Sequence, residues 1–263
     1  MFKKKQEEIE IVEGIFTDTT DYNYYKMTIK DMIIGFLIGF AGGFVAIQLF
    51  FSIIFISIPV AVGCGIYSIK IYKEKIIEKR KKRLLLQFRD LLDSLNNSMA
   101  AGDNVRDSFT NALEDMRSQH GENASITEET NIIVSGMYNN ITIEELLENF
   151  AERSHLEDIQ DFCNTFNTCL RLGGNLKLIV NDCRDVITQK IDIELEIKTI
   201  VASNKNQLNI VVIMPFALIG LMGMMGFEEV MAVNLTTIVV KVIALIAFGF
   251  SYKLGQKIVD IKV

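Results

Sequence analysis

The sequence from residue 32 to residue 69 contains no charged side chain at any position. Two further apolar runs follow near the C-terminus, one over positions 208–227 and one over positions 230–252 that is interrupted only by Lys241. A helix of about 20 apolar residues crosses a bilayer. The first run would make a helix of about 57 Å at about 1.5 Å per residue, so it predicts two spans with a tight turn near positions 48 to 52. The runs together predict four transmembrane helices, as hairpins over residues 32–69 and 208–252.

The distribution of Lys and Arg predicts the orientation of these helices. Eight Lys or Arg residues lie between positions 70 and 83, whereas neither predicted hairpin tip carries one. Since basic residues gather on the cytoplasmic side, we expect a multi-pass protein of the cytoplasmic membrane. The N-terminal tail (residues 1–31), the central domain (70–207) and the C-terminal tail (253–263) would all be cytoplasmic. A long, mostly polar segment precedes the first apolar run, so a cleavable signal peptide is not expected.

The central domain has the apolar spacing of amphipathic helices and no alternating strand pattern. Apolar residues recur every three or four positions, as in the set Phe88, Leu91, Leu92, Leu95, Met99, then Val105, Phe109, Ala112, Met116, and then Phe162, Cys163, Phe166, Cys169, Leu170. We expect six helices, the first continuous with the second transmembrane helix, the second from Val105 to about Met116 and the third from Thr127 to about Met137. The predicted fold is all-α, with a cytoplasmic six-helix bundle.

Turn and cap residues mark where these helices end. Gly102, Gly136 and the pair Gly173-Gly174 are expected to end or break helices, and Asn175 is expected to cap the last one. The short Gly173–Asn175 connection predicts an antiparallel hairpin. Asp103 is the expected N-cap of the helix from Val105, and Thr142 with Glu145 forms a predicted capping box that opens the fourth helix.

Helix packing and membrane contact suggest roles for a few more residues. Gly35, Gly39 and Gly43 repeat a small-xxx-small pattern that permits close helix approach, either within the hairpin or to another subunit or a passing helical substrate. Pro59 and Pro215 fall inside the second and third apolar segments, and Pro59 predicts a kink there. The tyrosines that precede the first segment are expected to lie at the lipid headgroups; they are Tyr22, Tyr24 and Tyr25.

The composition offers little for catalysis. The Gly-rich places lack the Lys-Ser/Thr of a phosphate loop, the two histidines are isolated, and the four cysteines fit small apolar side chains better than a disulfide or metal framework. We expect no enzyme activity, no cofactor and no metal. Positions 84 to 207 hold 10 Lys or Arg against 21 Asp or Glu, which argues against nucleic-acid binding. The carboxylates are expected on solvated helix faces, and the basic cluster at 70–83 against anionic lipid headgroups.

Several segments, taken in order, resemble one known family. They are Gln87 to Leu95, Ala100-Ala101-Gly102, Ser108 to Ala112, Gly136, Thr142 to Ala151, Leu172 to Leu176, and Pro215. Over roughly residues 50 to 220 the chain is similar to the type II secretion system F-domain family, and within it to Tad (Flp) pilus platform proteins, TadB-like or TadC-like. Arg89 stands where the family often has a proline, which leaves the choice between these two open.

The resemblance implies a platform protein with a single F domain. Such a protein would couple a hexameric secretion ATPase to insertion or extraction of pilin subunits, next to a second platform protein or in a homodimer. The acidic domain would meet the ATPase at polar loop tips, for which Asp103, Asn104, Asn139 and Asn140 are the candidates. The alternative is a membrane sensor or receptor with a helical cytoplasmic signalling bundle.

Lys241 admits three interpretations. It could reach the outer headgroups with its long side chain, or pair with Glu228 or Glu229. The resemblance adds a third, in which Lys241 holds a pilin glutamate.

Overall fold

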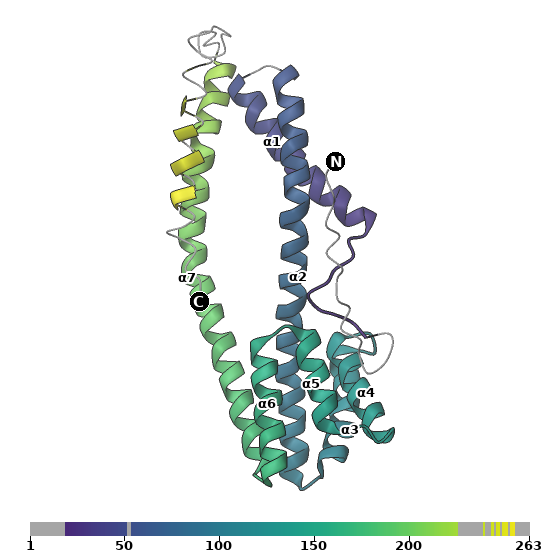
Figure 1. Cartoon of the computed structure of the whole chain (residues 1–263). Coiled ribbons are helices and arrows are strands. Elements are labelled where there is room, and N and C mark those ends of the chain that lie inside the picture. The colour runs from purple at the N-terminus through teal and green to yellow at the C-terminus, as the bar shows by residue number, and fades with distance from the viewer. Residues whose placement is uncertain are drawn as a thin grey trace. The chain divides into compact units, whose positions relative to one another are not determined.

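The computed structural model describes residues 19–51 and 54–225, and scattered positions between 239 and 255 (239, 243, 244, 246, 247, 249–251 and 253–255). These residues form helices and no strand, which agrees with the all-α prediction. The helices are α1 (Ile29–Phe51), α2 (Ile54–Ala101), α3 (Val105–His120), α4 (Ser125–Tyr138), α5 (Ile143–Ser154), α6 (Glu157–Leu172) and α7 (Leu176–Met224) (Figure 1).

The chain divides into two compact units. Unit 1 comprises residues 1–25 and 75–191, and unit 2 comprises residues 26–74 and 192–263. Unit 1 therefore holds the C-terminal part of α2, helices α3 to α6 and the first part of α7. Unit 2 holds α1, the first part of α2 and the remainder of α7.

The structure corrects the prediction of four transmembrane helices. Among the helices formed by the described residues, none combines the length and the apolar character that crossing a membrane requires. The prediction counted uncharged runs; the first half of the first run lies in α1, whereas its second half and the run from position 208 are parts of longer helices. The second half of the first run opens the 48-residue helix α2, and the run from position 208 closes the 49-residue helix α7, both of which also carry many charged residues. Most of the run from position 230 lies outside the described residues.

Unit 1 is a helical bundle with one apolar core. Aromatic side chains from four helices meet at its centre, where the Phe88 ring lies 5.3 Å from Phe162 and 6.0 Å from Phe150, and Phe109 lies 6.4 Å from Phe166. All five rings are at most 1% exposed. The predicted helix faces are therefore confirmed for α2, α3 and α6. On α7, Ile187 is buried and Val186 is 61% exposed.

Helix ends follow local chemistry, with two corrections. Asn104, and not Asp103, caps α3: its side-chain oxygen accepts the Asp107 N–H at 2.9 Å. The Asp103 side chain instead accepts a hydrogen bond from Asn111 at 3.0 Å, and the Asp103 N–H donates to the Ser98 carbonyl at 3.2 Å. That bond closes the end of α2 around Gly102, as is usual where a helix ends at a glycine. Gly136 does not break α4, which continues to Tyr138. Instead Gly136 is buried where a side chain would collide with Leu146 of α5.

The segment before α1 is also different from its prediction. Tyr22 does not lie at an interface with lipid but is 1% exposed inside unit 1. Its backbone N–H donates to the Arg153 carbonyl at 3.0 Å, and the Arg80 guanidinium lies 5.9 Å from its ring centre. A tyrosine ring is large enough to contribute to a helical core when its hydroxyl finds a partner. The described residues around Tyr22 are thus part of the bundle.

In unit 2, helices α1 and α2 approach closely at glycines. A Cβ atom at Gly39 would lie 2.6 Å from the Cys64 carbonyl oxygen, and one at Gly43 would lie 3.0 Å from the Cys64 Cβ. Gly35 faces Tyr72 of the same unit. The three glycines thus lie where α1 packs against α2. Pro59 lies inside α2 and Pro215 inside α7.

Candidate interaction site on the helical bundle

The polar residues at the bundle turns come together at one end of unit 1. The Arg106 guanidinium at the start of α3 lies 5.8 Å from the ring centre of Tyr138 at the end of α4. Asn167 near the end of α6 donates to the Glu144 carbonyl at the start of α5, at 3.2 Å. The α2–α3, α4–α5 and α6–α7 turns therefore share one end of the bundle (Figure 1). This end carries Asp103, Asn104, Asn139 and Asn140 together with Gly102, Gly173, Gly174 and Asn175.

Each turn is fixed by its own residues. Gly102 has a φ of 101° and Gly173 has a φ of 70°. Both values lie in the left-handed region, which glycine adopts at least cost. Asn140 also has a positive φ of 62°, a conformation that asparagine tolerates. The Asn175 side chain accepts the Leu178 N–H at 3.3 Å and caps α7. Short turns of this kind hold their polar side chains at defined positions, which suits a docking surface.

At the α2–α3 turn the side chains bond mainly to each other. Asn104 donates to Asp107 at 2.7 Å, and Asn111 donates to Asp103 at 3.0 Å. All four residues are exposed. The turn thus presents two carboxylates in a fixed arrangement.

A second polar cluster, which no sequence pattern predicted, lies inside the bundle. Arg153 of α5 is 1% exposed and donates to Glu129 of α4 through Nη1 at 2.7 Å and Nη2 at 2.5 Å. The Tyr22 hydroxyl donates to the same Glu129 carboxylate at 2.9 Å. Arg153 also donates to the Thr20 carbonyl at 3.1 Å and to the Asn149 side chain at 2.8 Å. Glu129 therefore contradicts the expectation that the carboxylates of the central domain are solvated.

The electrostatics of this cluster follow from its burial. Burial raises the pKa of Glu129 above its usual range, while the hydrogen bonds and charge of Arg153 and the Tyr22 hydroxyl oppose that rise. Burial together with the Glu129 charge raises the pKa of Tyr22 far above its ordinary value. A proton on Tyr22 is thus strongly held. The cluster is suited to joining three segments of the chain, and its side chains are closed to solvent, so it offers no access to a substrate.

The histidines, like the buried cluster, hold the structure together. His120 Nε2 lies 3.1 Å from Asp90, and His155 Nε2 lies 3.1 Å from Asp21. His155 has a left-handed φ of 51° at the end of α5, and its carbonyl accepts from Lys81 at 3.5 Å. Both rings therefore connect elements of unit 1. The expectation that they are isolated is wrong.

The four cysteines are free thiols. Cys163 is buried, Cys169 and Cys183 are half-buried, and Cys64 is exposed. Burial raises the pKa of the Cys163 and Cys183 thiols, so neither favours the reactive thiolate. Within the part of the chain that the structure describes, no group of three or more His, Cys, Asp or Glu side chains is placed to hold a metal ion.

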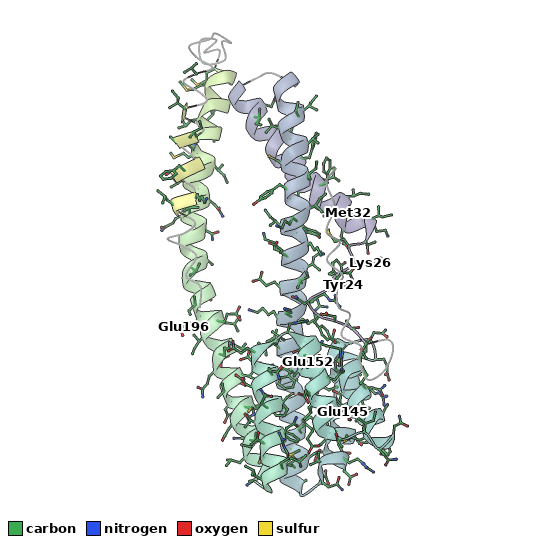
Figure 2. All side chains as sticks on the ribbon, in the orientation of Figure 1. Tyr24, Lys26, Met32, Glu145, Glu152 and Glu196 are labelled. Atoms are coloured by element: carbon green, nitrogen blue, oxygen red, sulfur yellow. The ribbon has the colours of Figure 1, made fainter. Side chains whose placement is uncertain are left out.

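The exposed carboxylates of the bundle give it an acidic surface. Glu145 and Glu152, near opposite ends of α5 and labelled in Figure 2, are both exposed. The Glu145 end of α5 is the end at which the three turns gather. Lys241, the remaining predicted contact residue, lies outside the described residues.

Comparison of this chain with models of protein families, with curated proteins and with solved structures gives no match.

Proposed function

We propose that this protein is a platform protein of a Tad/Flp-type pilus or a type II-like secretion machine. In this role it couples a hexameric secretion ATPase to the insertion or extraction of pilin subunits. The protein acts at the cytoplasmic membrane with its bundle in the cytoplasm, beside a second platform protein or a second copy of itself. The identity of the machine rests on the resemblance of residues 50–220 to the F-domain family.

The observation that carries the proposal is the gathering of three turns at one end of an acidic bundle. Asp103, Asn104, Asn139 and Asn140 come from two turns that are far apart in the sequence, and they share this end. A surface formed by rigid turns on a helical bundle suits binding of a protein better than binding of a small molecule. Its carboxylates complement a basic partner surface.

The helices that lead out of the bundle support a coupling role. Helices α2 and α7 each contribute residues to both units, and neither helix is interrupted where the units divide. In the proposed role, these two helices are the connection between the ATPase-binding bundle and unit 2. The proposal gives this chain no catalytic step, because the ATPase partner hydrolyses the nucleotide.

Affinity capture of the full-length protein from its host tests the proposal. We expect a secretion ATPase and pilins among the captured proteins, recovered from the membrane fraction. Capture of signalling proteins without an ATPase would favour the sensor alternative. Since charged surfaces are screened beyond about 8–10 Å at physiological salt, recovery of the ATPase should fall as salt is raised.

Two charge reversals on one helix locate the contact. Glu145→Arg reverses the charge at the end of α5 where the three turns gather, and Glu152→Arg reverses it at the other end. Both residues are exposed. We expect Glu145→Arg to lower recovery of the ATPase and Glu152→Arg to leave it unchanged. Equal recovery for both variants would exclude the turn end as the contact.

A further inference from the structure

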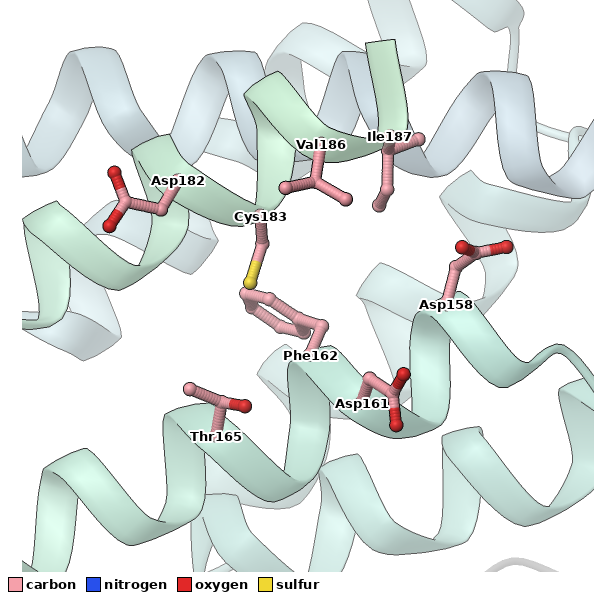
Figure 3. A pocket seen from close by; sticks show the side chains of 8 residues that line it. All are labelled: Asp158, Asp161, Phe162, Thr165, Asp182, Cys183, Val186 and Ile187. Atoms are coloured by element: carbon pink, nitrogen blue, oxygen red, sulfur yellow. The ribbon is translucent and has the colours of Figure 1, made fainter. Parts of the chain in front are cut away.

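A groove between α6 and the first part of α7 has no role in the proposed function. Phe162 of α6 and Ile187 of α7, which are 1% and 2% exposed, line it together with the more exposed Cys183 and Val186. Figure 3 shows Phe162 and Cys183 turned toward one another between the two helices. Asp158, Asp161 and Asp182 also line the groove, so an apolar floor has a rim of carboxylates on both helices.

The size of the groove limits what it can hold. Its volume is about 170 Å³. Pockets for cofactors and other small molecules are larger and commonly measure about 300–1,000 Å³. A single large side chain fits the volume of this groove. The groove is therefore suited to one anchor residue of a protein partner, the arrangement that dominates binding energy in many interfaces.

The charges around the groove favour a cation. Asp158 already holds the Lys190 ammonium group, with Nζ 2.8 and 2.9 Å from its two oxygens. Among the described residues, no ion pair is formed by Asp161 or Asp182. Burial, and then the charges of Asp182 and Asp161, raise the pKa of the Cys183 thiol between them. The rim thus has negative charge beyond what Lys190 neutralises.

We propose that this groove binds an arginine side chain of a protein partner, with the aliphatic stem on Phe162, Val186 and Ile187 and the guanidinium at one of the two rim carboxylates that form no ion pair among the described residues, Asp161 or Asp182. Arginine combines an apolar stem with a head that is planar, weakly hydrated and matched to carboxylates. An uncharged apolar side chain would leave the rim carboxylates without a partner. A lysine carries a strongly hydrated point charge, so we expect it to bind less tightly than arginine. The inference does not depend on the proposed function.

Methyl NMR of the full chain tests this binding with small peptides. The probe is acetyl-Ala-Arg-Ala-amide, and the comparison peptides carry citrulline or lysine in place of arginine. We expect the arginine peptide to shift the methyl signals of Val186 and Ile187 in a saturable way, and the citrulline peptide to leave them unmoved. No shift with arginine, an equal shift with citrulline, or equally tight binding of lysine would overturn the proposal.

Substitutions of the rim carboxylates test where the guanidinium of the arginine peptide binds. Asp161→Asn and Asp182→Asn keep the shape of each side chain, and both positions are exposed. Because solvent weakens an exposed ion pair, we expect the affinity for the arginine peptide to fall only roughly two- to fivefold in at least one of these two variants. Glu152→Gln on α5 removes an exposed carboxylate outside the groove and should leave the affinity unchanged. Unchanged binding in both Asn variants, or equal weakening in the Glu152 variant, would refute a site at this rim.

Discussion

Arg153 of α5 and Glu129 of α4 form a two-pronged ion pair inside the bundle, with both side chains at most 2% exposed. The two residues are 24 positions apart in the sequence. The hydroxyl of Tyr22, which is 107 positions from Glu129, also donates to the Glu129 carboxylate. Removing two charges from water is costly, so such a pair persists only when its remaining hydrogen bonds are also made. Here the N-terminal segment supplies two of them, from the Tyr22 hydroxyl and the Thr20 carbonyl.

Replacing one member of this pair should destabilise unit 1. Glu129→Gln leaves the buried Arg153 charge without its counter-ion, and we expect a loss of about 3–5 kcal/mol in the free energy of opening. Hydrogen exchange of the α4 and α5 amides measures that loss locally. The control is Glu128→Gln, at the exposed neighbouring position, which should change the free energy of opening by no more than about 0.5 kcal/mol. Similar losses for the two variants would mean that the pair does not stabilise the bundle.

Tyr22 predicts a specific sensitivity to alkaline pH. Its pKa is raised in the folded protein from an ordinary value of 10.0. Above about pH 10 the unfolded chain releases this proton while the folded chain keeps it, so stability is complete below that pH and declines as the pH rises further, by about 1.4 kcal/mol per pH unit. We expect Tyr22→Phe to flatten the alkaline decline in a pH series of urea unfolding. Tyr24→Phe, whose ring is 43% exposed, should keep the wild-type slope.

Phe166 should be one of the side chains that stabilise the bundle most. It is fully buried and packs against Phe162 and Phe109. Phe166→Ala removes these contacts and leaves a cavity, so we expect a cost of about 3–5 kcal/mol. Urea unfolding followed by circular dichroism measures it. Asn164→Ala, on the exposed side of the same helix, is the matched control, and a cost as small as that of the control would place Phe166 outside the core.

Two glycines of α1 give a matched pair for unit 2. A Cβ atom at Gly39 would meet the Cys64 carbonyl at 2.6 Å, which α2 can relieve only by moving its backbone, whereas a Cβ atom at Gly42 meets nothing within 4 Å. We expect Gly39→Ala to destabilise unit 2 by about 1–3 kcal/mol. Gly42→Ala should instead stabilise it slightly, because alanine favours the helix by about 1 kcal/mol. Faster hydrogen exchange of α1 amides in the Gly42 variant than in the Gly39 variant would contradict the observed packing.

Helices and turns were predictable because their determinants are local. The spacing of Phe88, Leu91 and Leu95 marks a helix face whatever the rest of the chain does. The left-handed Gly173 and the Thr142 cap likewise depend on neighbouring residues, and the structure confirms both, with Thr142 accepting the Glu145 N–H at 3.4 Å. At Asp103 and Asn104 two capping signals competed: α3 begins at Val105 as predicted, but Asn104 supplies the cap.

At the candidate sites, the sequence predicted the residues of the turns but not their common location. It identified Asp103, Asn104, Asn139 and Asn140 from turn chemistry, while only the antiparallel packing of the helices brings the two turns to one end. Asp161 and Asp182 lie on separate helices, and the groove between them exists only once α6 and α7 pack. A helical pattern alone does not reveal such a groove.

The sequence by itself therefore determined the helical class of the described residues and most helix ends, because hydrogen bonds between i and i−4 and cap bonds span only a few residues. Tertiary structure decided which turns share one end of the bundle and which polar groups are buried. An uncharged run shows only the composition of a segment and does not mark the ends of a helix. Helices α2 and α7 each contain both an uncharged run and charged segments. The buried position of Glu129 was decided by Arg153 and Tyr22, because a carboxylate is stable inside a protein only where distant segments bring donors to it.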